Sequence, residues 1–198
     1  MCCSYSYHLA DVYLGRSSIQ IPTSDVLADP VLWPRTMAAH RVSHSWAPNF
    51  GFRLVVAALR EAGHPPLPQL SSVRALMNAG EQVTAEVVDA FLRLTGLDGR
   101  VMQPAFGMAE TATCVTYCTD YGADRLQLRL TADGEATEDE AGGQARSFID
   151  LGPPVPGVEL RIVSPPRGDA TPPTLEKPFA RLSQPRLRVT LILFTMNS

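Results

Sequence analysis

The chain has 198 residues, of which 45% are hydrophobic and 19% charged, and its formal net charge is -3. It is therefore long enough to bury a real core, as one domain or as one large piece of a domain. The slight acidity and the scattered arginines give no positive field for nucleic acid or for an anionic membrane surface, so no nucleic-acid partner is predicted.

The cysteines and the chain ends indicate a cytoplasmic protein. Cys2, Cys3, Cys114 and Cys118 lack the spacing of a disulfide framework or of a zinc site, which favours reduced thiols. No basic segment followed by an apolar run is present at the N-terminus, so no signal peptide is predicted. The apolar run 189–194 is too short to cross a bilayer, and no membrane span is predicted.

The first forty residues predict two strands and a helix. Residues 10–15 have the composition of a short strand that ends at a glycine, and residues 19–21 that of a second strand. Asp29 is then the expected N-cap of a helix that has Pro30 at its first position and runs toward His40.

The middle of the chain predicts strands that alternate with helices. Residues 42–46 alternate as a strand does, and the apolar residues within 49–63 recur on one helical face. Residues 70–78 contain a strand that leads into a glycine turn. Residues 84–96 then read as a helix with a threonine N-cap and a glycine stop.

The last third predicts shorter elements. A strand is expected at 100–103, a buried run at 114–117 and a half-exposed strand at 126–130. The acidic, glycine-rich stretch 133–143 is interpreted as a solvated loop rather than a metal site. Residues 158–163 alternate as a strand does.

One stretch, Gln103–Thr111, gathers the side chains that could handle a nucleotide. Phe106 offers a flat face on which a planar base can stack, and Gly107 lets the backbone approach a ligand closely. Glu110 could ligate a hard cation such as Mg2+. The alternative interpretation is a loop that leaves a buried strand, with a core phenylalanine and a surface glutamate.

Two further blocks give this stretch a context: Val73–Val83 upstream and Gly152–Val163 downstream. The order and spacing of the three blocks resemble the adenylate-forming superfamily of acyl-CoA synthetases, fatty acyl-AMP ligases and adenylation domains of polyketide and peptide synthetases. The resemblance is strongest to the fatty acyl-AMP ligase-like modules that load polyketide synthases, and it covers residues 8–163.

The resemblance implies an α/β fold with a mixed, mostly parallel sheet flanked by helices, as part of the large N-terminal domain of such an enzyme. It implies ATP and Mg2+ as cofactors, with Glu110 as the metal ligand. Two turns would line the adenine, through residues Asn78, Ala79, Gly80, Glu81, Phe106, Gly107, Met108 and Ala109. Alanine at 109, glutamine at 82 and phenylalanine at 106 depart from common family residues without removing the pattern.

The strand and helix around residues 42–63 would border the acyl pocket in this family. By resemblance the substrate-pocket residues are His44, Trp46, Asn49 and Phe50. The alternative is that Trp46 and Phe50 simply fill the core.

The implied reaction is the ATP-dependent activation of a carboxylic acid, by resemblance a fatty acid, as an acyl-adenylate. The acyl group would pass to a thiol of coenzyme A or of carrier-protein phosphopantetheine. Three family features have no counterpart here: the glycine-rich phosphate loop, the ribose-binding Thr-Gly-Asp and the catalytic lysine. The single lysine, Lys177, lies in a proline-rich tail.

These gaps predict a central fragment of a ligase. Residues 8–163 would be a partial AMP-binding domain between an unmatched N-terminus, 1–7, and an unmatched tail, 164–198. Without cations to support the developing negative charge, little or no turnover is expected from this chain alone. The alternative is a non-catalytic α/β module, either a nucleotide-binding pseudoenzyme or an interaction fragment.

Overall fold

A computed structural model describes residues 9–63, 66–108, 114–122, 127–130, 136–137, 144–147, 149–156 and 158. These residues fall into two compact units. The first unit holds the described residues up to 122 together with 149–153, and the second holds strands β5 to β7. The predicted termini 1–7 and 164–198 lie outside the described residues.

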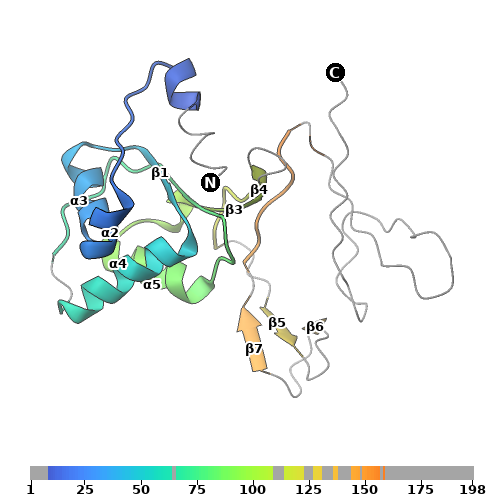
Figure 1. The fold of residues 1–198 in the computed structure, drawn as a ribbon. Helices are drawn as coiled ribbons and strands as arrows, with labels where there is room; N and C mark the ends of the chain where they lie inside the picture. Colours follow the sequence, from blue (N-terminus) through green and yellow to red (C-terminus); the bar gives the residue numbers. More distant parts are fainter. Residues whose placement is uncertain are drawn as a thin grey trace. The chain divides into compact units, whose positions relative to one another are not determined.

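A four-stranded sheet forms the centre of the first unit. Its strands are β1 (His44–Ala47), β2 (Ala75–Asn78), β3 (Met102–Gly107) and β4 (Cys114–Tyr117), in the order β1-β2-β3-β4 (Figure 1). The first three strands are parallel, whereas β4 pairs with β3 in the antiparallel sense. The predicted mixed, mostly parallel sheet is confirmed.

Helices connect the successive parallel strands, as the crossovers of such a sheet require, and two further helices precede β1. They are α2 (Thr23–Ala28), α3 (Leu32–Ala39), α4 (Asn49–Glu61), α5 (Ala85–Thr95) and the short 3-10 helix η1 (Gly99–Val101). The predicted α4 and α5 are confirmed. Helix α5 begins after Thr84 and ends at Gly96, whose left-handed backbone (φ 69°) closes the last turn as only glycine does without strain.

The second unit contains a three-stranded antiparallel sheet with the order β6-β5-β7. Its strands are β5 (Gln127–Leu130), β6 (Ala136–Thr137) and β7 (Gln144–Ser147). Strand β5 confirms the strand predicted at 126–130. Strand β6 falls inside the stretch predicted to be a solvated loop, whose other residues lie outside the described ones.

Three aromatic rings hold the helices of the first unit together. They are Trp33 of α3, Phe52 of α4 and Phe91 of α5. The ring centroids are 5.1 Å apart for Trp33 and Phe52, 6.0 Å for Trp33 and Phe91, and 4.9 Å for Phe52 and Phe91. Leu76 of β2 and Met102 of β3 join the same buried cluster. Because strand side chains alternate between the two faces of a sheet, these contacts place α3, α4 and α5 on one face.

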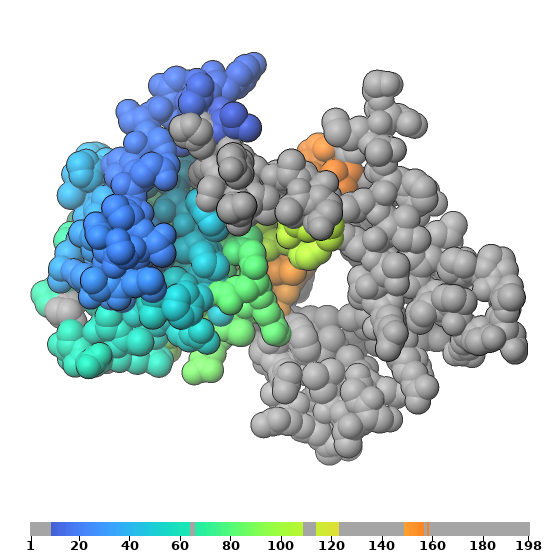
Figure 2. Space-filling model, in the orientation of Figure 1, coloured from blue at the N-terminus to red at the C-terminus, as the bar shows by residue number. Residues whose placement is uncertain are grey.

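The predicted strands at 10–15 and 19–21 are wrong. Residues 9–13 are helical, and Leu14 N donates to Ala10 O at 2.9 Å, while 19–21 lie in no strand. The apolar residues Leu9, Val12 and Tyr13 follow the helical repeat, but they are 64%, 68% and 89% exposed. This segment projects from the rest of the unit (Figure 2, dark blue).

The helix predicted from Asp29 starts later than expected. Helix α3 begins at Leu32, and Asp29 instead ends α2. Its carboxylate accepts a hydrogen bond from Val31 N at 3.1 Å and pairs with Arg35 at 3.1 Å. Asp29 thus shapes the turn between the two helices. None of the helices formed by described residues is long and apolar enough to cross a membrane.

Two phenylalanines of α4 provide a matched test of this core. Phe52 is fully buried within the aromatic cluster, whereas Phe50, two residues earlier, is 40% exposed. We expect Phe52→Ala to lower the free energy of unfolding by about 3–5 kcal/mol, because it leaves a cavity among the rings. Phe50→Ala should cost no more than about 1 kcal/mol. Urea unfolding followed by circular dichroism measures both, and equal losses would contradict the assigned packing.

Candidate functional site

The carboxyl ends of β2 and β3 bring the two predicted adenine-binding segments to one edge of the sheet. Asn78, the last residue of β2, is in register with Pro104 of β3. Strand β3 continues past this level to Gly107, beyond the predicted end at 103. Phe106 therefore lies on a strand end rather than in a turn, and it pairs with Thr116 of β4. Open α/β sheets bind their ligands at this edge.

The turn after β2 forms one side of this edge. Ala79 is buried, and Gly80 is exposed with a φ of 93°. A Cβ added to Gly80 would meet nothing within 4 Å, so the backbone angle, and not crowding, requires the glycine. The bare backbone of this turn thus faces open space that a flat ligand can approach.

The buried carboxamide of Asn49 locks this turn to the start of α4. Its Oδ1 accepts from Asn78 Nδ2 and from Thr84 N, both at 3.3 Å. Its Nδ2 donates to Thr84 Oγ1 at 3.2 Å. Thr84 precedes α5 as predicted, but its hydroxyl bonds Asn49 and does not cap the helix. A residue predicted to border the acyl pocket therefore positions the turn that is predicted to bind adenine.

A second link joins the same two segments. The carboxylate of Glu81 accepts a hydrogen bond from Phe50 N in the first turn of α4. The positive end of the helix dipole favours a carboxylate at that place. The ring of Phe50 remains 40% exposed, with the guanidinium of Arg53 5.4 Å from its centroid. The exposed Phe50 does not fill the core, which was the alternative left open by its sequence.

Trp46 also lies with the segments that are predicted to bind adenine. A small cluster on the sheet contains the buried Ala79 and Ala105, with Trp46, Met77 and Tyr117 packed against it. Trp46 is only partly buried. The structure thus brings three of the four predicted substrate-pocket residues to the edge that carries the predicted adenine turn.

His44 is the exception. It is the first residue of β1 and is in register with Ala75, whereas Ala47 at the other end of β1 is in register with Asn78. Three residues of strand, about 10 Å, separate the two levels. His44 is exposed, and its Nδ1 lies 2.8 Å from Ser43 Oγ. The structure places it at the opposite edge of the sheet.

Among the described residues, two buried polar atoms have no hydrogen-bond partner: Oδ1 of Asn78, whose residue is in register with Pro104, and Oγ1 of Thr116, whose residue pairs with Phe106. Leaving such an atom unpaired costs about 1–3 kcal/mol, which a ligand's hydrogen bonds can recover. The sequence analysis missed Thr116, whose only signal is a hydroxyl within the apolar run 114–117. Together with an aromatic face and an open glycine turn, these atoms suit a planar base that carries hydrogen-bonding groups.

The remaining predicted residues divide into two groups. Gly107 and Met108 are half-buried at the end of β3. Ala109 and the predicted Mg2+ ligand Glu110 lie outside the described residues. Within the described part of the chain, no three histidine, cysteine, aspartate or glutamate side chains are grouped to hold a metal ion.

The fold and this edge together define an α/β protein with a candidate ligand-binding site at the carboxyl ends of its parallel strands. The AMP-binding enzyme family matches residues 1–176. The chain belongs to that family.

Among its relatives is microperfuranone synthase from Emericella nidulans, 30% identical over 164 residues that cover 79% of this chain and 15% of the relative. A solved adenylation domain of a keto acid-selecting NRPS module, bound to keto acyl adenylate, is 32% identical with a TM-score of 0.71. That match covers 80% of this chain and 30% of the other.

A fatty acid AMP ligase from Legionella pneumophila is 25% identical with a TM-score of 0.66, over 78% of this chain and 28% of that one. The chain therefore spans less than a third of the length of each of these three proteins. The predicted resemblance to adenylate-forming enzymes and the α/β fold are confirmed.

The Asn49 carboxamide gives a prediction about the integrity of the site. Asn49→Ala should lower the free energy of unfolding by about 1–3 kcal/mol, because Asn78 Nδ2 and Thr84 N lose their acceptor. Thr84→Val should cost less on top of Asn49→Ala than alone, since the shared bond is already absent. Urea unfolding of the two single variants and the double variant measures this coupling. Strictly additive losses would mean that the two side chains do not cooperate.

Proposed function

We propose that the chain supplies the adenine-binding edge of an ATP-dependent, AMP-forming ligase that activates a carboxylic acid as its acyl-adenylate. The carrying observation is the convergence of three features at one sheet edge of an AMP-binding family member: Phe106, Gly80 and the Asn78 oxygen, which has no partner among the described residues. ATP supplies the α-phosphate that the acid attacks, with pyrophosphate as the leaving group.

Each residue of the edge has a role in binding. Phe106 stacks on the base, while the backbone of Ala79 and Gly80 lines its other side. The Asn78 carboxamide oxygen accepts from the exocyclic amine of adenine, and the Thr116 hydroxyl provides a second hydrogen-bonding group. Glu110 holds Mg2+, as the sequence predicts. Trp46 and Phe50 lie toward the acid.

Two classes of acid are candidates. The motifs resemble those of fatty acyl-AMP ligases, and this resemblance makes a fatty acid one candidate substrate. The identity to the keto acid-selecting domain is 32%, against 25% for the fatty acid AMP ligase, and this difference favours a keto acid. We take the keto acid as the first candidate and the fatty acid as the second.

We further propose that turnover requires sequence beyond this chain. The chain covers 15% of microperfuranone synthase and 30% of the solved keto acid-selecting domain. The phosphate loop, the ribose-binding aspartate and the catalytic lysine expected for this family would come from the rest of the domain. The acyl group then passes to a thiol of coenzyme A or of a carrier protein. We place the reaction in the cytoplasm, as the sequence predicts.

A ligand-induced shift of the melting temperature tests the proposed edge. At a hundredfold excess over Kd, a non-hydrolysable acyl-adenylate analogue should stabilise the chain by about 2.7 kcal/mol, or roughly 5–10 °C. Phe106→Ala should abolish this shift, because the stacking face is lost, whereas Phe106→Tyr should keep it. Scanning calorimetry with and without the analogue measures the shift.

The outcomes separate the competing functions. An equal shift in wild type and Phe106→Ala would exclude stacking at this edge. Keto acyl and fatty acyl analogues compared at equal concentration rank the two acids. The pseudoenzyme alternative predicts a different pair of results. The analogue would still shift the melting temperature, but the chain would catalyse no pyrophosphate exchange even when the rest of the domain is supplied.

A further inference from the structure

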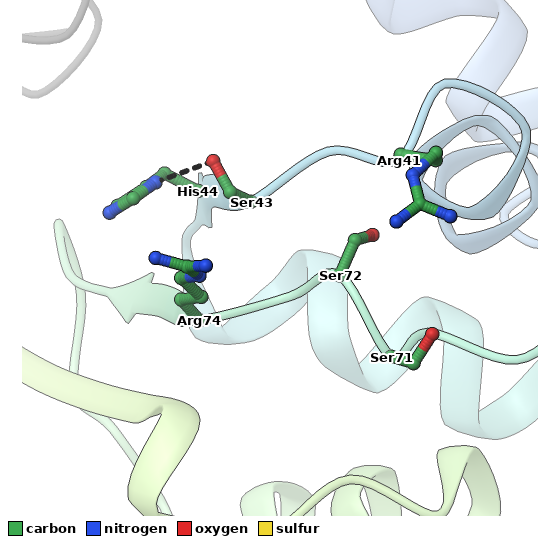
Figure 3. A pocket seen from close by; sticks show the side chains of 6 residues that line it. All are labelled: Arg41, Ser43, His44, Ser71, Ser72 and Arg74. Carbon is green, nitrogen blue, oxygen red and sulfur yellow. Dashed lines mark hydrogen bonds between the residues drawn. The ribbon is translucent and has the colours of Figure 1, made fainter.

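The described residues form a second candidate site at the opposite edge of the sheet. A cavity of about 390 Å³ opens where β1 and β2 begin, far along the strands from Asn78. It is lined by Arg41, Ser43, His44, Ser71, Ser72 and Arg74 (Figure 3). The described lining contains two guanidinium groups, an imidazole and three hydroxyls, and none of these described residues is a carboxylate.

The guanidinium groups of Arg41 and Arg74 form no ion pair with the described residues. The one ion pair among the described residues joins Arg35 to Asp29, and neither Arg41 nor Arg74 has a carboxylate partner in that part of the chain. Both are exposed. Figure 3 shows the guanidinium of Arg41 pointing toward Ser72 and that of Arg74 lying near Ser43 and His44. Two unneutralised cations beside one cavity attract an anion.

The polar groups between the arginines are held in place. Ser72 Oγ donates to Val42 O at 3.1 Å, so its lone pairs remain while its position is fixed. Ser43 Oγ lies 2.8 Å from His44 Nδ1, and this contact orients the imidazole. When the hydroxyl donates to Nδ1, the ring carries its proton on Nε2, which is then a free donor.

The backbone of Arg41 supplies an independent observation. Arg41 N donates to Ala38 O at 3.2 Å and Val42 N to Met37 O at 2.9 Å, the bonding pattern of a Schellman motif after α3. In this motif the residue after the C-cap has a left-handed backbone and is normally glycine. Here that residue is Arg41, with a φ of 50°. An arginine there is strained, and such strain concentrates at functional positions.

We propose that this cavity binds the phosphate or diphosphate group of a soluble small molecule. A phosphate presents several acceptor oxygens in a tetrahedral array, which the guanidinium, imidazole and hydroxyl groups around the cavity can engage from different sides. A planar carboxylate would occupy one guanidinium and leave the other unpaired. The site is separate from the adenine edge, so its occupation does not depend on the ligase function.

The test titrates the 15N-labelled chain with inorganic phosphate, pyrophosphate or acetate at constant ionic strength, followed by amide chemical shifts. We use shifts and not melting, because phosphate also stabilises proteins by exclusion from their surface. Phosphate or pyrophosphate should shift the amide signals of Ser72 and Arg74 along a saturable curve. The ligand with the lower Kd shows whether the cavity prefers a phosphate or a diphosphate group. The amides around Gly96, at the end of α5, should stay in place.

Three variants complete the experiment. Arg41→Gly removes the guanidinium while relieving the backbone, so it should melt higher than wild type and yet bind phosphate at least tenfold more weakly. Arg74→Gln should lose binding to a similar degree. Arg60→Gln makes the same charge change in the last turn of α4 and should bind as wild type does.

Each contrary result overturns the proposal. Acetate that moves the same amides as strongly as phosphate would show general charge attraction. Undiminished binding by the folded Arg41→Gly variant, or no saturable shift with either phosphate ligand, would show that the cavity is not a phosphate site.

Discussion

The buried carboxamide of Asn49 is the interaction on which the candidate adenine edge depends. A single side chain bonds the end of β2 through Asn78 and the start of α5 through Thr84, from the first residue of α4. Apolar packing alone, as in the Trp33–Phe52–Phe91 cluster, holds helices against a sheet without fixing the path of a turn. Directional hydrogen bonds in a low-dielectric interior fix that path. The edge is thus built on a small polar network inside an otherwise apolar unit.

A parallel sheet gives its two edges different chemistry. At the carboxyl edge of this sheet, the strands end in Asn78 and Phe106–Gly107, and the side chains are aromatic, small or amide. At the amino edge, the strands begin beside Arg41 and Arg74, and the lining is cationic and hydroxylic. The short strands keep the two edges about 10 Å apart. His44, predicted to belong with the first set, lies with the second for this geometric reason.

The helices after β1 and β2 could be predicted from sequence because their local and tertiary signals agree. Helix α5 has a threonine before it, a glycine after it and a regular apolar stripe, and helix α4 has the same stripe. The strand predicted at 10–15 is wrong because a short apolar run fits a strand or a helix equally well. Only the presence or absence of a neighbouring strand to pair with distinguishes the two. The strand predicted at 100–103 stops short of Pro104, whereas β3 runs through this proline to Gly107, although proline is rare in a central strand. The strand continues because Pro104 O accepts from Cys118 N at 2.8 Å, which keeps β4 paired across the proline. The positioning role of Asn49 could not be predicted, because it rests on contacts with Asn78 and Thr84, which are far away in sequence.

The two links between α4 and the turn after β2 have a consequence for how substrates interact. Asn49 joins α4 to Asn78, and the Glu81 carboxylate joins it to Phe50. The segment that faces the proposed acid and the turn that faces the proposed adenine are therefore joined, and Trp46 packs against the small cluster that contains Ala79. A shift of either segment has to break directional bonds in the other, so a ligand that orders one side lowers the entropic cost of ordering the second. Coupling of this kind favours an acid and a nucleotide bound together over either bound alone, which is the arrangement that joining them requires.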